Sequence, residues 1–136
     1  MNEGDEEEQL HSAAQDGDLP KVKELIEKGY SLNRFDDVSK TPLHYAVEGE
    51  HLDVVQYLIQ SGADVNAHEE SKIGNTPLRE VADNCSYEIA KILIDAGADP
   101  TIPGWMQLTA ILKAEKRKKE EGVRVYRLLI EAAKRF

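Results

Sequence analysis

Apolar residues recur along this chain at a helical spacing and, on a longer scale, at intervals of about 33 residues. One position in each of four segments carries leucine or isoleucine: Leu10, Leu43, Leu78 and Ile111. Three residues further on, a small or slim side chain recurs: Ala13, Ala46, Val81 and Ala114. Spacings of three and four residues place such positions on one face of a helix. The pattern therefore predicts four similar helical units.

A second apolar stripe follows the first in every unit and predicts a second helix. Its central position is occupied by Leu25, Leu58, Leu93 and Leu129, each followed by isoleucine: Ile26, Ile59, Ile94 and Ile130. One turn earlier stand Val22, Val55, Ala90 and Tyr126. Each unit is thus predicted to contain two helices, with the small residues of the first helix at the point of closest approach.

The ends of these helices are marked by residues with known positional preferences. Thr41 and Thr76 are N-cap candidates, and each is followed by a proline that suits the first helical position. The second helices are expected to open near residues 18–20 and near Leu52. They should close at Gly29, Gly62 and Gly97, because glycine readily adopts the left-handed C-cap conformation. The polar segments 30–40, 63–75 and 98–108 are expected to project as turns or hairpins.

Two motifs in phase with this pattern resemble the ankyrin-repeat family. Residues 41–46 read Thr-Pro-Leu-His-Tyr-Ala, and 76–79 read Thr-Pro-Leu-Arg; each lies 21 residues before a Gly-Ala-Asp triplet, at Gly62 and Gly97. The family's unit is a turn followed by two antiparallel helices, with a Thr-Pro-Leu-His-x-Ala signature. The resemblance covers residues 8–136. It implies an all-α ankyrin-repeat solenoid with projecting hairpin turns and repeats at about 8–40, 41–75, 76–108 and 109–136.

Departures from the family pattern lie in the terminal units and in the connections. Glu8-Gln9 and Thr109-Ala110 replace Thr-Pro, as expected of units that cap a stack. Two extra residues within 68–73 predict a longer second loop. Three extra residues within 116–122 are assigned to the connection between the last two helices. Glu50 and Cys85 stand where glycine is usual, which leaves the geometry of those two turns open.

Composition agrees with one folded domain over residues 8–136 that is preceded by an acidic tail at 1–7, expected to be disordered. No apolar run approaches the roughly 18 residues needed to cross a membrane, and the acidic N-terminus does not resemble a signal peptide. The single cysteine cannot form an internal disulfide. A reducing, cytoplasmic location is expected.

Charge is unevenly distributed and bears on the kind of partner. The formal net charge is −9; residues 9–112 carry 17 acids against eight bases, whereas 113–136 carry nine bases against four acids. Such a surface repels nucleic acid and favours a basic protein partner. The alternative is that the acidity only keeps a repeat protein in solution.

The residues that could carry chemistry have structural explanations that are simpler. His11 and His44 occupy the signature position, which the family resemblance assigns to backbone hydrogen bonding between repeats. His51 and His68 have no ligand partners at metal spacing, and Cys85 is expected to be a surface or half-buried thiol in a turn. Phosphate-binding glycine motifs are absent. We therefore expect no enzyme activity, cofactor, metal or small-molecule substrate.

The family resemblance places the binding surface on the turn tips and the exposed side of the first helices. By register, the expected partner-binding residues are Asp37, Val38, Lys40, Tyr45, Glu48, Glu69, Glu70, Lys72, Ile73, Glu80, Asp83, Asn84, Trp105, Met106, Gln107, Lys113 and Lys116. Trp105 is either an exposed anchor, of the kind that dominates interfaces, or a cap folded over the last repeat.

These observations predict a non-enzymatic module, monomeric alone, that binds another protein through its concave face. A sharper hypothesis is an inhibitor or immunity protein of the kind that bacteria direct against a basic effector, which acidic residues would steer into place. The alternative from another class is a structural scaffold or self-assembling repeat protein.

Overall fold

The computed structural model describes residues 8–72 and 74–136, and at Trp105 it describes the backbone without the side chain. These residues belong to two compact units, Met1–Asp64 and Val65–Phe136, each described by itself below. Within the described ranges, every regular element is helical and no strand is present. The predicted all-α fold class is confirmed. The tail at 1–7 lies outside the described residues, and the single domain over 8–136 stays a prediction.

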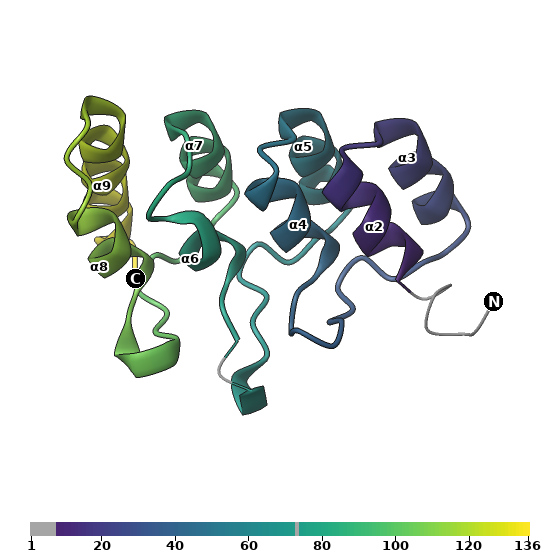
Figure 1. The fold of residues 1–136 in the computed structure, drawn as a ribbon, viewed down its shortest axis with the longest axis horizontal. Coiled ribbons are helices and arrows are strands. Elements are labelled where there is room, and N and C mark those ends of the chain that lie inside the picture. The colour runs from purple at the N-terminus through teal and green to yellow at the C-terminus, as the bar shows by residue number, and fades with distance from the viewer. Residues whose placement is uncertain (1–7, 73) are drawn as a thin grey trace. The chain divides into compact units, whose positions relative to one another are not determined.

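The first unit contains two helix pairs joined by a projecting loop (Figure 1). Its helices are α2 (Gln9–Asp16), α3 (Leu19–Glu27), α4 (Pro42–Glu48) and α5 (Leu52–Gln60). Helix α2 packs against both α3 and α4, and α4 packs against α5. The predicted apolar positions form the core, with Leu10, Val22, Leu25, Leu43, Val55 and Leu58 at most 1% exposed. The first loop, residues 28–41, joins α3 to α4.

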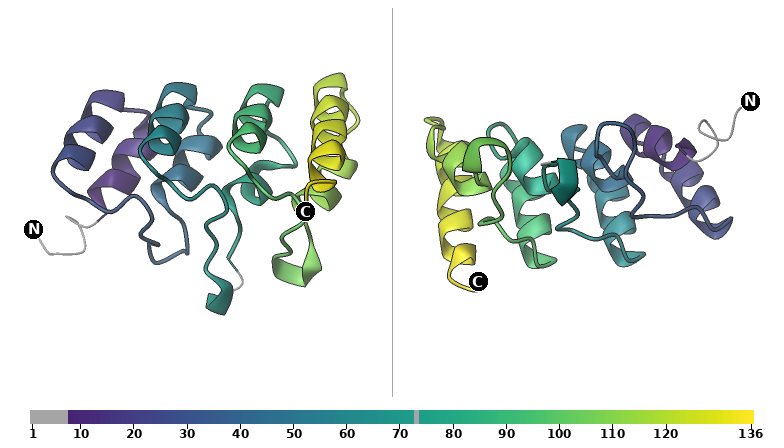
Figure 2. Two further views of the ribbon diagram at one scale, coloured as in Figure 1. Left: turned by 180° about the vertical axis from the view of Figure 1, so that it is seen from behind. Right: turned by 90° about the horizontal axis from the view of Figure 1, so that it is seen from below.

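The second unit repeats this plan with longer connections. It contains α6 (Pro77–Val81), α7 (Tyr87–Asp95), α8 (Ala110–Glu115) and α9 (Glu120–Ala133). Short 3-10 turns, η1 (Glu70–Lys72) and η2 (Trp105–Gln107), lie in its two loops, 65–76 and 98–109, which project from the same side of the unit (Figure 2). Helix α9 packs against α7 and α8, and α6 packs against α8. Leu78, Ile89, Leu93, Val125 and Leu129 are buried between them.

The predicted threonines Thr41 and Thr76 lie at the N-caps of α4 and α6, and Thr109, which the sequence did not single out, is the N-cap of α8. The Thr76 hydroxyl accepts a hydrogen bond from the Arg79 N–H at 3.1 Å, and the Thr109 hydroxyl accepts one from the Leu112 N–H at 3.2 Å. In α4 the Thr41 N–H donates to His44 Nδ1 at 3.0 Å. Because Nδ1 accepts this bond, the imidazole proton is at Nε2. The helix ends are also as expected, since Gly29, Gly62 and Gly97 all have a positive φ after the last turn.

Two asparagines that are 33 residues apart connect successive loops in the same way. In the first unit Asn33 Oδ1 accepts from the Asp64 N–H at 2.8 Å, and in the second Asn66 Oδ1 accepts from the Asp99 N–H at 2.7 Å. The amide of Asn66 also donates to the Gly97 carbonyl at 3.1 Å. These bonds satisfy backbone groups in irregular segments that would otherwise need water. The loops are therefore fixed to the scaffold at their bases.

His51, which directly precedes α5, forms a hydrogen bond with α2 and so links the two helix pairs of the first unit. Its Nε2 lies 2.9 Å from the Gln15 carbonyl oxygen, and because a carbonyl can only accept, Nε2 carries the proton. A Cβ added at Gly17 would lie 2.5 Å from this ring, and Gly17 also has φ +70°. Glycine at position 17 is thus needed both for its backbone conformation and for the close approach of His51.

We expect Gly17→Ala to destabilise the protein more than Gly29→Ala. Both alanines would adopt a left-handed conformation, which costs roughly 1–2 kcal/mol, but a Cβ at Gly29 meets nothing within 4 Å. The difference should appear in the free energy of unfolding from urea denaturation. In a His51→Ala background the two alanine substitutions should cost the same. Equal costs in the wild-type background would show that the His51 ring does not restrict position 17.

Two local expectations need correction, and one point that the sequence left open is answered. The three extra residues of the last unit do not lengthen the turn alone: α9 starts three residues before the position equivalent to Leu19, which adds nearly a full turn at its start. Cys85 is neither exposed nor half-buried, since only 1% of it is accessible, because α6 ends early and the chain turns inward. Glu50 adopts the left-handed conformation usual for glycine, φ 55°, whereas Cys85 does not.

The last helix departs from the predicted stripe. Leu129 is buried as expected, but Val125 lies beside it in the core, Tyr126 is half-buried and Ile130 is 38% exposed.

No described helix has both the length and the apolar character that crossing a bilayer requires.

Candidate functional site

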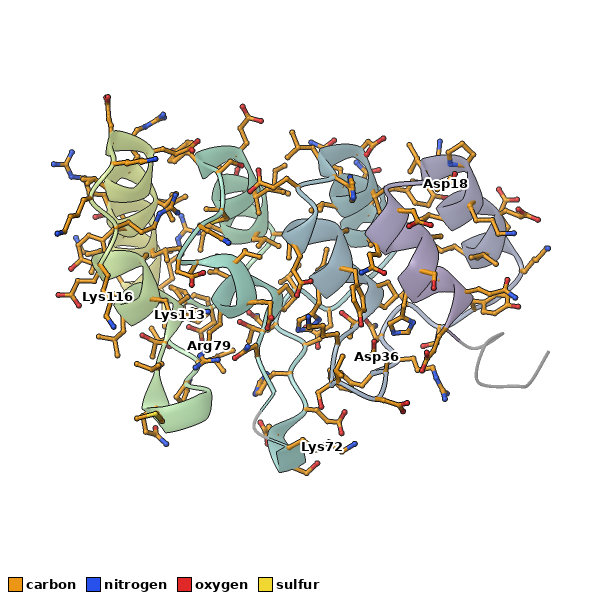
Figure 3. The ribbon with its side chains drawn as sticks, in the orientation of Figure 1. Asp18, Asp36, Lys72, Arg79, Lys113 and Lys116 are labelled. Atoms are coloured by element: carbon orange, nitrogen blue, oxygen red, sulfur yellow. The ribbon has the colours of Figure 1, made fainter. Side chains whose placement is uncertain are left out.

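The first loop and the exposed side of α4 form a polar cluster in the first unit, here called the first-loop patch (Asp36, Val38, Lys40, Tyr45 and Glu48). The Asp36 carboxylate accepts hydrogen bonds from the Tyr45 hydroxyl and, at 3.0 Å each, from the N–H groups of Val38 and Lys40. Lys40 Nζ lies 2.7 Å from Glu48 Oε1 and 5.3 Å from the centre of the Tyr45 ring. Figure 3 shows Asp36 in the loop, next to α4. The loop is therefore held against the helix.

The electrostatics of this patch reflect the same contacts. Burial opposes ionisation of Asp36, but the hydrogen bonds from Tyr45, Lys40 and Val38 outweigh it and hold the pKa of the carboxyl below its ordinary value. Burial and the hydrogen bond to Asp36 raise the pKa of Tyr45. The Tyr45 hydroxyl therefore remains protonated, and its hydrogen bond is used inside the protein. What the patch offers to solvent is Val38, which is 63% exposed at the tip of the loop, together with the exposed Glu48.

We expect Tyr45→Phe to raise the pKa of Asp36 toward its ordinary value, because one of three donors to the carboxylate is lost. Since the folded pKa of Asp36 lies below the unfolded one, its contribution to stability is present above about pH 4. That contribution is lost as the pH falls through the folded pKa. NMR titration of the Asp36 carboxyl carbon should show the shift, with Tyr57→Phe as the control. An unchanged pKa in Tyr45→Phe would mean that the tyrosine does not stabilise the carboxylate.

In the second unit the two loops enclose a hollow of about 670 Å³, here called the finger hollow. The second loop contributes His68, Glu70 and Gly74 to its wall. The third loop contributes Ile102, Pro103, Gly104, Met106 and Gln107. Met106 is 74% exposed. The wall is thus largely apolar on the side of the third loop and polar on the side of the second.

The third loop has an unusual backbone at its tip. Met106 and Gln107 both have positive φ, 57° and 62°, although neither is glycine. The Gln107 N–H donates to the Gly104 carbonyl at 3.0 Å, and the Gly104 N–H donates to the Leu108 carbonyl at 3.1 Å. Such conformations persist only where surrounding contacts enforce them, and they cluster at functional sites.

Arg79 contacts the third loop on either side of this tip, at Gly104 and Leu108. It replaces the signature histidine, is only 5% exposed, and its Nε–H donates to the Leu108 carbonyl. Burial lowers the pKa of the guanidinium, which Glu80 partly offsets. A Cβ at Gly104 would collide with the guanidinium group. Lys113 Nζ in turn donates to the Arg79 carbonyl at 2.6 Å, and Figure 3 shows the two residues side by side at the base of the loop.

The sequence-predicted residues lie in three kinds of environment. Those that are exposed are Asp37, Val38, Glu48, Glu70, Lys72, Asp83, Asn84, Met106, Gln107 and Lys116. Those that are half-buried and bonded within the protein are Lys40, Tyr45, Glu69, Glu80 and Lys113. Ile73 and the Trp105 side chain lie outside the described residues. The exposed group gathers on the loops and at the ends of α4, α6 and α8.

The structure adds residues to this surface that the sequence reading did not select. His68, Gly74, Ile102, Pro103 and Gly104 line the finger hollow. Of these residues, the sequence pointed only to Pro103 and Gly104, which it marked as residues that form turns. The role of Arg79 could be found from its place in the signature, where the histidine of the first unit bonds to a loop carbonyl. That histidine is His11, with Nε2 2.8 Å from the Arg34 oxygen.

The described side chains do not form a site of metal-binding type. Among residues 8–72 and 74–136, no three His, Cys, Asp or Glu side chains converge as metal ligands would. The free Cys85 thiol is buried.

Known proteins resemble this chain over its repeats. The chain is 42% identical over 93 residues to the ankyrin repeat and KH domain-containing protein mask-1 of Caenorhabditis elegans, covering 68% of this chain and 4% of that protein. It is 37% identical over 99 residues to an ankyrin repeat protein of Rickettsia felis, covering 66% and 42% of the two chains. It is 39% identical over 95 residues to the palmitoyltransferase AKR1 of Lachancea kluyveri, covering 68% and 13%. The chain spans less than half the length of each of these relatives.

A family model agrees with the repeats that the structure shows. The model that describes three copies of the ankyrin repeat matches residues 10–104, which include the helix pairs α2–α3, α4–α5 and α6–α7. Ankyrin repeats generally act as protein-binding modules rather than as enzymes, and the palmitoyltransferase shows that the same repeats occur within an enzyme chain. The paired helices, the capped Thr-Pro starts, the glycine ends and this match together mean that the chain belongs to the ankyrin-repeat family.

Proposed function

We propose that this protein binds a partner protein through its projecting loops and the exposed ends of its first helices. The observation that carries the proposal is the position of the most exposed large apolar side chains. Among the described residues before the terminal Phe136, these are Met106, 74% exposed, and Val38, 63% exposed, and each lies at or next to the tip of a loop. Turn tips normally carry polar residues, so apolar tips on loops that are fixed at their bases suit contact with another protein.

The scaffold supports this role through rigidity. The asparagine bridges join the loops at their bases, and the Asp36 and Arg79 contacts hold the first and third loops to the helices beside them. A surface ordered in advance loses less conformational entropy on binding. The partner of this proposal is a protein with basic groups, because the net charge of −9 speeds the encounter with positive charge.

The bacterial inhibitor hypothesis is a narrower form of this proposal. Its support is the acidity of a small repeat protein, and no contact in either unit selects a toxin as the partner. Binding of a basic protein would be consistent with it, and the identity of that protein would decide it.

The test is affinity capture from a lysate of the source organism with the protein as bait. The loop variant combines Val38→Asp, Glu48→Lys and Met106→Asp, all at exposed positions outside the core. The control combines Leu112→Asp and Glu88→Lys, exposed residues on α8 and α7. We expect a protein that wild type and control retain and the loop variant loses. Equal retention by all three folded baits would place the binding surface elsewhere, and mass that rises with concentration in light scattering would favour self-assembly.

A further inference from the structure

The finger hollow has the size of a binding site but not the enclosure of a small-molecule pocket. Its volume of about 670 Å³ lies within the range of roughly 300–1,000 Å³ that ligand sites show. Such pockets bury most of their ligand, whereas two residues in this wall are largely open: Met106 is 74% exposed and the Glu70 side chain is 84% exposed. An open hollow between two loops suits side chains that project from a larger partner.

The apolar side of the hollow selects for one kind of side chain. Ile102, Pro103 and Met106 come from the third loop, which Arg79 holds from below. The unbranched thioether of methionine adapts to differently shaped apolar groups. The left-handed conformation at Met106 and Gln107 is imposed on two residues that disfavour it. The hollow therefore presents a fixed apolar wall with one adaptable side chain.

The opposite side of the hollow carries the exposed Glu70 carboxylate, whose described ion-pair partner is a histidine. Glu70 lies on the rim, and His68 Nε2 is 3.4 Å from its carboxylate. The neighbouring Glu69 is bonded to Lys72 at 3.3 Å. None of the described residues that line the hollow is a lysine or an arginine. The guanidinium of Arg79 lies buried beneath Gly104, where it donates to the Leu108 carbonyl. A positive group beside Glu70 would thus meet an exposed carboxylate for which no lysine or arginine among the described lining residues competes.

We propose that the finger hollow binds a short linear segment of the partner, which places an apolar side chain against Ile102, Pro103 and Met106 and a Lys or Arg beside Glu70. This inference rests on the proposed protein-binding function and specifies its partner. The negative charge of Glu70 favours a basic residue in the bound segment, and the apolar wall favours a neighbouring apolar residue. A single apolar anchor with an adjacent rim charge is a common way for an interface to combine affinity with specificity.

The experiment uses a phage-displayed library of random linear peptides and the immobilised wild-type protein. Enriched sequences should contain a large apolar residue with a Lys or Arg close to it. One enriched peptide is then synthesised and its Kd measured by fluorescence anisotropy against wild type, Glu70→Lys, Met106→Asp and the control Glu88→Lys. Glu88 is an exposed acid on α7 of the same unit, so the control changes net charge equally.

The expected result is a loss of affinity of about tenfold for Glu70→Lys and for Met106→Asp, with little change for Glu88→Lys. A peptide whose basic residue is replaced by glutamate should bind Glu70→Lys better than it binds wild type. That charge exchange cannot arise from misfolding. Raising the salt concentration should weaken the wild-type complex with the basic peptide, because the rim pair is exposed to solvent.

Three results would overturn the inference. They are enrichment of peptides without a basic residue, equal losses for Glu70→Lys and Glu88→Lys, and failure to enrich any peptide. Each leaves the proposed function standing if the capture experiment still finds a partner that the loop variant loses. Capture that is insensitive to the loop variant would instead remove the proposed function itself.

Discussion

Replacing Leu58 by alanine should lower the free energy of unfolding by about 2–5 kcal/mol. Leu58 in α5 is fully buried and occupies the central position of the second apolar stripe in its unit. The substitution removes apolar contacts and leaves a cavity that the surrounding helices fill only in part. Because domains of this size have a total stability of roughly 5–15 kcal/mol, the loss should be plain in the midpoint of urea denaturation.

The neighbouring Ile59→Ala is the matched control, because it removes a similar apolar side chain from the next residue of the same helix, where burial is only partial. Its cost should be clearly smaller. An unchanged denaturation midpoint for Leu58→Ala, or equal losses of stability for the two variants, would mean that α5 does not turn its Leu58 face toward the core.

Replacing Arg79 by alanine should cost about 1.5–3 kcal/mol, because the Leu108 carbonyl loses a charged donor in a buried position. The third loop should also lose the contact that holds its left-handed tip, so the proposed binding at the finger hollow should weaken. Urea denaturation measures the first effect, and hydrogen exchange of the amides at 104–108 measures the second.

Arg79→His is the informative control because it restores the signature residue of the other units. In the first unit His11 reaches a loop carbonyl with Nε2 at 2.8 Å, so histidine at 79 should retain part of the bond. Gly104→Ala should be costly with arginine present and tolerated better with histidine, since the collision is with the guanidinium. Equal costs of Gly104→Ala in the two backgrounds would contradict this account of the loop.

The fold was predictable because its signals are local. A proline after Thr41 or Thr76, leucine at helical spacing and glycine after the last turn each concern residues within about four positions of one another. The structure confirms the helices at these places, with Thr41 and Thr76 as N-caps and Gly29, Gly62 and Gly97 in the left-handed region. A repeat also provides internal checks, because the same local signal must recur in phase.

What the sequence did not reveal depends on contacts between residues about 30 positions apart. The Asn33 and Asn66 bridges and the contact of the His51 ring with Gly17 join different repeats. The contact of Arg79 with Gly104 joins a helix to the distant loop of the same repeat. Asparagine and glycine in a loop normally indicate only a turn. The burial of Cys85 was missed for a local reason instead, since α6 ends at Val81, earlier than the repeat pattern indicates.

The repeat register predicted which residues of the candidate surface are exposed, but not which of them are already bonded within the protein. Register correctly placed Val38, Glu48 and Met106 at exposed positions on the loops and on α4. It could not show that the Tyr45 hydroxyl and the Lys113 ammonium are already bonded within the protein. Nor could it show that His68 and Ile102, from different loops, line one hollow. Those distinctions require the positions of side chains, which a repeat pattern does not contain.

The most direct test of the central claim is site-specific photocrosslinking in a native lysate. A photoreactive phenylalanine analogue would be placed in turn at Val38, at Met106 and, as the control, at Leu112, which is 42% exposed on α8. The account predicts that the same partner protein is crosslinked from Val38 or Met106 and not from Leu112, as identified by mass spectrometry. Crosslinking of a partner from Leu112 alone would contradict the claim that the projecting loops are the binding surface.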